Sequence, residues 1–157
     1  MSMRRHLPHL LARAGTVSAL TMVTIGATTV TPGATPDAEA AAVSTKALRI
    51  AASKRGSPYQ WGAQGPYRFD CSGLTRYSFK HAGKALPRTA AAQYNDTSHV
   101  SRGARRSGDL VFFHASGGVY HVGIYAGSGR IWHAPKAGAV VRLERIWSSA
   151  VWYGRVG

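Results

Sequence analysis

The sequence predicts an α+β domain in which helices come first and an antiparallel sheet follows. Apolar residues recur at helical spacing between residues 44 and 94, whereas short apolar runs separated by glycine-containing turns occupy residues 109–156. Consecutive strands without intervening helices pair antiparallel, so the second half should form one sheet with the helices packed on it. The length of 157 residues suits one such domain and not two.

The N-terminal segment does not fit this domain. Arg4, Arg5 and Arg13 give it a basic start, and residues 14–36 are uncharged. Residues 38–40 then read Ala-Glu-Ala, a pattern that a signal peptidase cuts. This order is typical of a secretory signal peptide.

We therefore expect residues 1–40 to be a signal peptide and residues 41–157 to be the folded, exported domain. A membrane anchor is the alternative, but Thr, Gly and Pro interrupt the apolar stretch, and a spanning helix needs about 20 predominantly apolar residues. The general secretory route and the twin-arginine route both remain open, because the Arg4-Arg5 pair is a weak signal.

The first helix of the domain is expected to follow a short tail at residues 41–43. Ser44 or Thr45 can cap it, and it should run to Lys54, before Gly56.

A loop rich in Gly, Pro and aromatic residues is expected over residues 57–69. The second helix should begin after Asp70 and stop at Gly83. Thr89 can cap a short third helix over residues 90–94.

Five strands are expected to complete the domain. They cover residues 109–113, 121–125, 130–133, 139–142 and 152–156, with glycine turns between the first three.

The chain is strongly basic, with a formal net charge of +14. Such a charge attracts polyanions, including nucleic acid, anionic lipid and anionic wall polymers. The export signal argues against nucleic acid, and the basic residues are scattered, with Arg105-Arg106 the densest point. We expect attraction to an anionic cell envelope, with plain solubility as the alternative.

The only cysteine, Cys71, lies where the loop turns into the second helix. A single cysteine forms no internal disulfide, so Cys71 is either an inert buried residue or a working thiol. The unpaired N–H groups at a helix N-terminus favour a thiolate and can bind an oxyanion.

Two histidines are placed to assist Cys71. His121 begins one expected strand and His133 ends the next, so adjacent antiparallel strands can bring them together at one edge of the sheet. One histidine would carry the proton and the other would orient it. From spacing alone, a catalytic and a structural role are equally supported.

Six motifs occur in order over residues 48–156 and resemble the NlpC/P60 cysteine peptidases. They are Tyr59-Gln60-Trp61-Gly62, Phe69-Asp70-Cys71-Ser72-Gly73-Leu74, Leu86-Pro87-Arg88-Thr89, Gly108-Asp109-Leu110-Val111-Phe112-Phe113, His121-Val122-Gly123-Ile124-Tyr125 and His133-Ala134-Pro135.

The resemblance implies a papain-like fold in which a helix carrying Cys71 packs on a sheet carrying His121 and His133. It implies that Cys71 is the nucleophile, His121 the general base and His133 the third polar residue, without a metal or cofactor. The implied activity is cleavage of peptidoglycan stem peptides, commonly between D-glutamate and the diamino acid. We expect a secreted, wall-associated monomer that neither binds nucleic acid nor stays in the membrane.

The resemblance also implies roles around the nucleophile. Tyr59 would donate to the oxyanion, or be a packing aromatic, and Trp61 would line the pocket, or lie in the core. Asp70 and Ser72 would bind the free amine of the stem peptide, or cap the helix. Arg88 would meet a substrate carboxylate, or be a surface arginine.

Two positions depart from the family pattern. Ala63 stands where a second glycine is frequent, and Ser107 replaces the usual proline before Gly108-Asp109. Neither change removes a catalytic group, but both bear on the shape of the substrate groove. The competing functions are a thiol amidase or acyltransferase of the same fold, and a non-catalytic basic wall-binding protein.

Overall fold

The computed structural model describes residue 33 and residues 35–157. The signal peptide expected over residues 1–40 therefore lies for the most part outside the described residues. Within them, no helix has the length and apolar character needed to cross a membrane.

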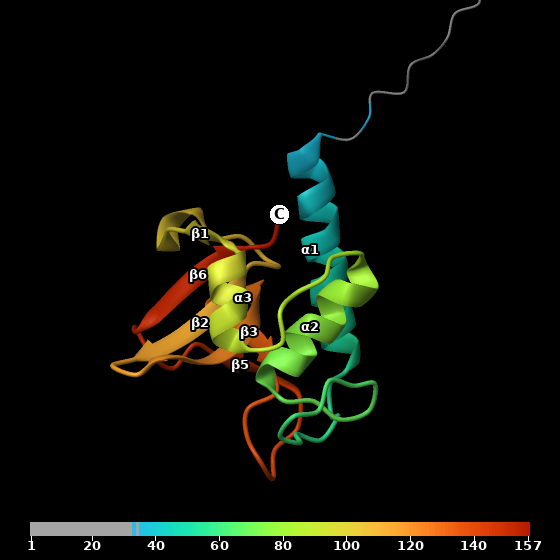
Figure 1. Cartoon of the computed structure of the whole chain (residues 1–157), viewed down its shortest axis with the longest axis vertical. Coiled ribbons are helices and arrows are strands. Elements are labelled where there is room, and N and C mark those ends of the chain that lie inside the picture. The colour runs from blue at the N-terminus through green and yellow to red at the C-terminus, as the bar shows by residue number, and fades with distance from the viewer. Residues whose placement is uncertain (1–32, 34) are drawn as a thin grey trace, which may run out of the picture. The chain divides into compact units, whose positions relative to one another are not determined.

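Three helices precede a six-stranded sheet, so the α+β prediction is confirmed (Figure 1). The helices are α1 (Pro36–Ser53), α2 (Cys71–Ala82) and α3 (Ala90–Asp96). The strands are β1 (Ser98–Val100), β2 (Leu110–Ala115), β3 (Gly118–Gly127), β4 (Arg130–His133), β5 (Arg142–Arg145) and β6 (Val151–Arg155), with a 3-10 turn at Arg102–Ala104.

The predicted boundaries of α2 and the predicted start of α3 are confirmed by their caps, whereas α3 ends at Asp96, two residues later than predicted. The Asp70 carboxylate accepts a hydrogen bond from the Gly73 N–H at 2.7 Å, and Gly83 ends α2 in the left-handed conformation with φ 109°. The Thr89 hydroxyl caps α3 by accepting from Ala92.

The start of α1 differs from the prediction. The helix begins at Pro36, capped by Thr35, and not at Ser44 or Thr45, so residues 41–43 are helical and not a tail. Proline at the first helical position and Asp37 in the first turn make a strong start signal further upstream. The described part of α1 becomes buried only from Ser44 onward, because its first turns project beyond the core (Figure 1).

The sheet is antiparallel throughout, with strand order β1-β6-β2-β3-β4-β5. The prediction of five strands missed β1, a three-residue strand that pairs with the edge of β6. Its sequence, Ser-His-Val, carries too few apolar residues to indicate a strand without its partner.

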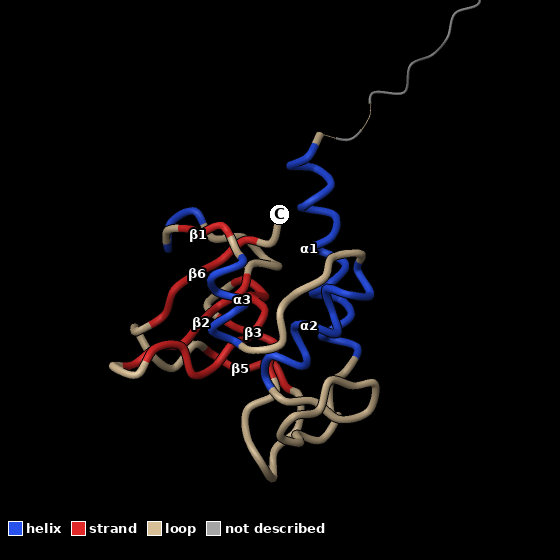
Figure 2. The backbone as a smooth tube through the Cα atoms, in the orientation of Figure 1, coloured by secondary structure: helices blue, strands red, loops and turns tan. Residues whose placement is uncertain are grey.

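The predicted strand at 139–142 was also misplaced. Ala139 and Val141 bond instead to the loop after α1, through Tyr59 N–H to Ala139 O and Gly56 N–H to Val141 O, both at 2.9 Å. The paired strand, β5, starts at Arg142 (Figure 2 shows the loops gathered beside the start of α2).

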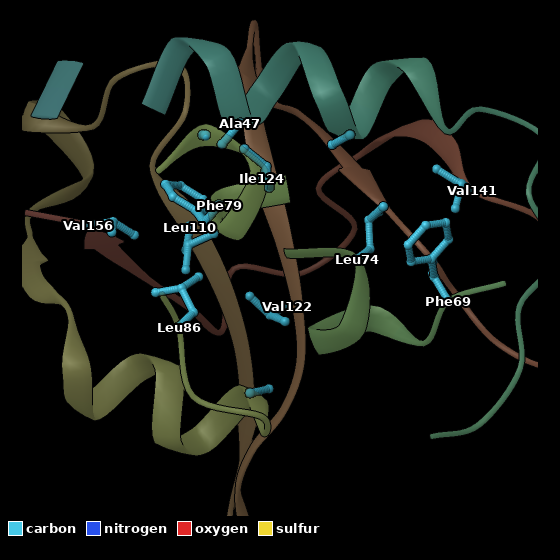
Figure 3. Packing of buried hydrophobic residues seen from close by; sticks show 14 of the residues in the cluster. Ala47, Phe69, Leu74, Phe79, Leu86, Leu110, Val122, Ile124, Val141 and Val156 are labelled. Carbon is cyan, nitrogen blue, oxygen red and sulfur yellow. The ribbon is translucent and has the colours of Figure 1, made fainter. Parts of the chain in front are cut away.

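Apolar residues fill both faces of the central strands. Leu110 and Phe112 face the helices, where they join Leu74 and Phe79 in the larger core (Figure 3). Val111 and its neighbour Phe113 join a second, smaller cluster on the opposite face. Burial on both sides explains why β2 is continuously apolar.

Candidate active site

Cys71 is the first residue of α2 and is partly exposed. The backbone N–H groups of Val122 and Ser72, together with the Ser72 side chain, lower the pKa of its thiol. Burial nevertheless raises the pKa of the Cys71 thiol, and the Asp70 carboxylate raises it further. The N–H donors at the start of the helix favour the thiolate, as expected from the sequence, but desolvation outweighs them in the resting site.

The two histidines come together as the strand spacing predicts. His121 lies within β3 and His133 ends β4, and His121 Nε2 is 2.8 Å from His133 Nδ1. Both are buried, with 6% and 1% of their surfaces exposed. Gly123 leaves room for this contact, since a Cβ there would lie 3.2 Å from His133 Cβ.

A β-bulge shapes β3 beside the pair. Phe113 is opposite His121 and His114 is opposite Val119, which leaves Tyr120 as the extra residue. Tyr120 is 56% exposed and contributes to the walls of the site. Bulges near functional sites re-aim neighbouring side chains, and this one separates the exposed Tyr120 from the buried His121.

A carboxylate continues the histidine chain. His133 Nε2 is 2.9 Å from Glu144 Oε2, and Arg142 Nε donates to the same oxygen at 2.8 Å. The register of β4 and β5, which pairs His133 with Arg142, brings these residues together.

Burial sets the charge state of the pair. It lowers the pKa of His121 to about 3, with repulsion from His133 as the second cause and attraction to Glu144 opposing it. Burial also lowers the pKa of His133, against the hydrogen bond to Glu144. The Arg142 guanidinium holds the pKa of Glu144 below its usual range. At neutral pH the site therefore contains neutral imidazoles beside a carboxylate.

Two adjoining cavities meet at Cys71, with volumes of about 370 and 410 Å³. Four residues line both: Tyr59, Trp61, Cys71 and Tyr120. The first cavity adds Asp70, Ser72, Arg88 and the start of α3, and the second adds His121, His133, Lys136, Arg142, Glu144 and Trp147. The arrangement can hold an extended chain across the sulfur.

The charged residues of the first cavity are bonded to one another. Arg88 donates to both carboxylate oxygens of Asp70, at 2.5 and 3.1 Å, and to Ser72 Oγ at 2.9 Å. Asp70 also accepts from Gly62 N–H at 2.9 Å. Asp70 is thus the helix cap, which was one of its two predicted roles, and Arg88 is an ion-pair partner and not a free surface residue.

The two predicted aromatic residues differ in their surroundings. Tyr59 is half-buried, packs on the larger core and reaches both cavities. Trp61 is 85% exposed, so it is a rim residue and not a core residue.

Several contributors were not predicted, among them the Val122 N–H, Tyr120, Glu144 and Trp147. Trp147 stacks on Phe113 at 4.0 Å and lies 5.3 Å from the His133 ring. The sequence offered one signal for Glu144: acidic residues are rare in this chain, with 6 against 20 lysines and arginines. Residues 33 and 35–157 contain no group of three or more His, Cys, Asp or Glu placed to hold a metal ion.

Comparisons with known proteins agree on one family. The model of the NlpC/P60 family matches residues 56–156. The chain is similar to the probable endopeptidase p60 of Listeria monocytogenes serovar 1/2a, with 45% identity over 106 residues. That match covers 64% of this chain and 22% of the Listeria protein, so the chain spans about a fifth of the relative's length.

Solved structures are similar as well. The peptidoglycan hydrolase RipB of Mycobacterium tuberculosis has a TM-score of 0.68 and 32% identity, over 77% of this chain and 68% of that one. RipD of the same organism is described as a non-catalytic NlpC/p60 domain protein adapted to peptidoglycan binding. It has a TM-score of 0.63 and 28% identity, over 73% of this chain and 97% of that one. The fold alone therefore does not decide between catalysis and binding.

Proposed function

Since this chain belongs to the NlpC/P60 family, we propose that it is a secreted cysteine endopeptidase that hydrolyses the stem peptides of peptidoglycan. The observation that carries the proposal is the contact of His121 Nε2 with His133 Nδ1, in a cavity whose wall includes the Cys71 sulfur. The names of the Listeria p60 and mycobacterial RipB relatives support the reaction class.

In the proposed mechanism Cys71 is the nucleophile, His121 the general base and His133 the residue that orients it. His121 takes the thiol proton as the sulfur attacks the carbonyl carbon of the scissile bond. The backbone N–H groups of the first residues of α2 and the Tyr59 hydroxyl stabilise the oxyanion. His121 then returns the proton to the leaving amine, and water hydrolyses the thioester.

The two cavities give the substrate a direction. The family resemblance assigns Asp70 and Ser72 to the free amine of the stem peptide, so the acyl side lies in the cavity that they line. The leaving side then lies in the cavity with His133 and Lys136. This orientation fits cleavage between D-glutamate and the diamino acid, with Trp61 covering the bound chain and Arg88 holding Asp70 and Ser72 in place.

We further propose that residues 1–40 direct export, that residues 41–157 form the catalytic domain and that the mature protein acts as a monomer at the cell wall. The net charge of +14 supports attraction to anionic wall polymers. We expect an exported protein of this kind to meet the cell wall and not nucleic acid.

The test is digestion of purified peptidoglycan by the protein and by Cys71→Ala, with mass spectrometry of the soluble products. Fragments split within the stem peptide, and absent with the variant, are expected, and their masses identify the bond. Release of intact stem peptides would identify an amidase instead. Products that also appear with Cys71→Ala would overturn the thiol mechanism.

A non-catalytic wall-binding function is the second candidate, and the similarity to RipD favours it. It predicts that the protein sediments with insoluble peptidoglycan and releases nothing, with Cys71→Ala indistinguishable from the unmodified protein. The buried histidine pair argues against this candidate, because burying two imidazoles serves no purpose that charge-driven wall binding requires.

A further inference from the structure

We propose that Glu144 is a positioning residue of this site: it fixes the proton positions on both histidines and balances the charge that forms on them during the reaction. The inference rests on the proposed thiol hydrolase function and adds a fourth residue to Cys71, His121 and His133. Glu144 acts through His133 and does not itself touch the substrate-attacking sulfur.

The two contacts of His133 fix the direction of the hydrogen bonds between Glu144, His133 and His121. An ionised carboxylate only accepts, so the hydrogen in the 2.9 Å contact between Glu144 and His133 must lie on His133 Nε2. His133 Nδ1 then carries a lone pair and accepts from His121 Nε2–H at 2.8 Å. Nδ1 of His121 is left unprotonated, as the only nitrogen of the pair free to take the Cys71 proton.

Glu144 also compensates the positive charge that forms on the histidine pair. When His121 accepts a proton, a cation forms in a site where burial disfavours it. Among the described residues, Glu144 is the only carboxylate within ion-pairing distance of either histidine. Arg142 opposes the cation, Lys136 adds a further positive charge to the cavity wall, and Asp70 acts on Cys71 and not on the histidines. Without Glu144 the site would hold an uncompensated cation.

The Glu144 carboxylate is held in place by Arg142. The Glu144 side chain is 39% exposed, and an unsupported carboxylate at that exposure would sample several rotamers. Arg142 Nε donates to the same oxygen that His133 uses, at 2.8 Å, so the carboxylate is held from two sides. Both residues lie on β5, whose register against β4 places them beside His133.

The test uses three variants of the full chain and two readouts that need no substrate. Glu144→Gln keeps an amide oxygen that can accept from both Arg142 and His133 but removes the charge, and Glu144→Leu removes both. Asp96→Asn is the matched control, because it removes one exposed negative charge at the end of α3. The readouts are the imidazole ¹⁵N chemical shifts, which report the tautomers, and the rate of alkylation by iodoacetamide, which reports on Cys71 alone.

Glu144→Leu should mix the tautomers of His133 and slow alkylation at pH 7 by about tenfold or more. Glu144→Gln should keep the tautomers but slow alkylation by about three- to tenfold, because the imidazolium loses its counter-charge. Asp96→Asn should match the unmodified protein in both. Unchanged tautomers and unchanged alkylation in both Glu144 variants would overturn the proposal, and Glu144→Gln alone decides it should Glu144→Leu fail to fold.

The same readouts separate this proposal from the proposed function. Changed tautomers and slower alkylation, together with no release of peptidoglycan fragments by the unmodified protein, would support the role of Glu144 and reject the substrate. Fragment release by the unmodified protein, with no effect of Glu144→Gln on the rate of alkylation, would support the proposed function and reject the role of Glu144.

Discussion

In the proposed mechanism, the nucleophile Cys71 and its base His121 start from neutral forms. Burial raises the pKa of the Cys71 thiol and lowers the pKa of His121 to about 3, so neither group is charged between weakly acidic and weakly alkaline pH. The proton must therefore move from sulfur to nitrogen within the reaction itself. The Val122 N–H and the Glu144 carboxylate stabilise the two charges that this transfer creates.

This charge state predicts an unusual acid limb in the pH profile. A base whose pKa is lowered stays unprotonated until the pH falls to the lowered value, so His121 should remain competent far below 6.5. We expect kcat/KM on a soluble stem-peptide fragment to stay level from pH 8 to about pH 5. Half-loss of activity near pH 6.5, with the fold intact by circular dichroism, would contradict a buried neutral His121.

Cys71, His121 and His133 could be predicted from the sequence, whereas Glu144 could not. Cys71, His121 and His133 lie in recognisable motifs, and strand spacing alone indicated that the histidines could meet. Glu144 depends on the register of β5, and the predicted strand ended at Arg142. When a strand is predicted two or three residues too early, a residue whose role depends on the pairing of that strand cannot be identified.

At the level of elements, the start of α2 is held by the loop that precedes it. Asp70 binds Gly62 N–H and Gly73 N–H with its two carboxylate oxygens, and Asp70 N–H donates to Ala63 O at 2.9 Å. Gly73 allows this close approach, because a Cβ there would lie 2.1 Å from Ala63 O. The position of the Cys71 sulfur therefore depends on a glycine two residues further on.

Gly73→Ala should therefore disturb the candidate site by shifting the start of α2. The added methyl group cannot be accommodated at 2.1 Å from a backbone carbonyl, so the loop or the first turn of α2 must shift. We expect a loss of about 1–3 kcal/mol in the free energy of unfolding in urea, with slower alkylation of Cys71. Gly103→Ala, where a Cβ would meet nothing within 4 Å, is the matched control and should change neither. Unchanged stability in Gly73→Ala would show that the loop yields freely.

The elements that sequence reasoning placed well are those that carry their own signals. Asp70, Gly83 and Thr89 mark helix ends by local hydrogen bonding and backbone conformation, and the structure confirms all three. The missed strand β1 and the shifted strand β5 are short edge strands whose existence depends on a partner far away in the chain. Local patterns do not encode that dependence.

For the molecule as a whole, three of the six acidic residues are held in ion pairs. Asp70 pairs with Arg88, Asp109 with Arg155, and Glu144 with Arg142 and His133. Acids committed in this way leave the excess of lysines and arginines to set the character of the surface. The net charge of +14 is therefore available to polyanions.

Binding to the wall should then depend on salt. We expect Cys71→Ala, which leaves the wall undigested, to sediment with walls containing anionic polymers at 50 mM salt and to be released largely at 500 mM, as the Debye length falls below about 5 Å. Walls stripped of anionic polymers are the control and should retain less protein at low salt. Retention that changes with neither salt nor removal of the anionic polymers would show that the protein binds through its peptide groove and not through its charge.

The raised pKa of the Cys71 thiol also affects how well the protein resists oxidation. Oxidants attack thiolates much faster than thiols, and a single cysteine has no neighbour that could rescue it as a disulfide. A site that keeps its sulfur protonated until a peptide is bound spends most of its life in the form that peroxide attacks slowly. The desolvation that lowers the reactivity of the resting thiol would thus also protect it from oxidation. If the proposed function is right, oxidative inactivation would depend more on the number of turnovers than on elapsed time.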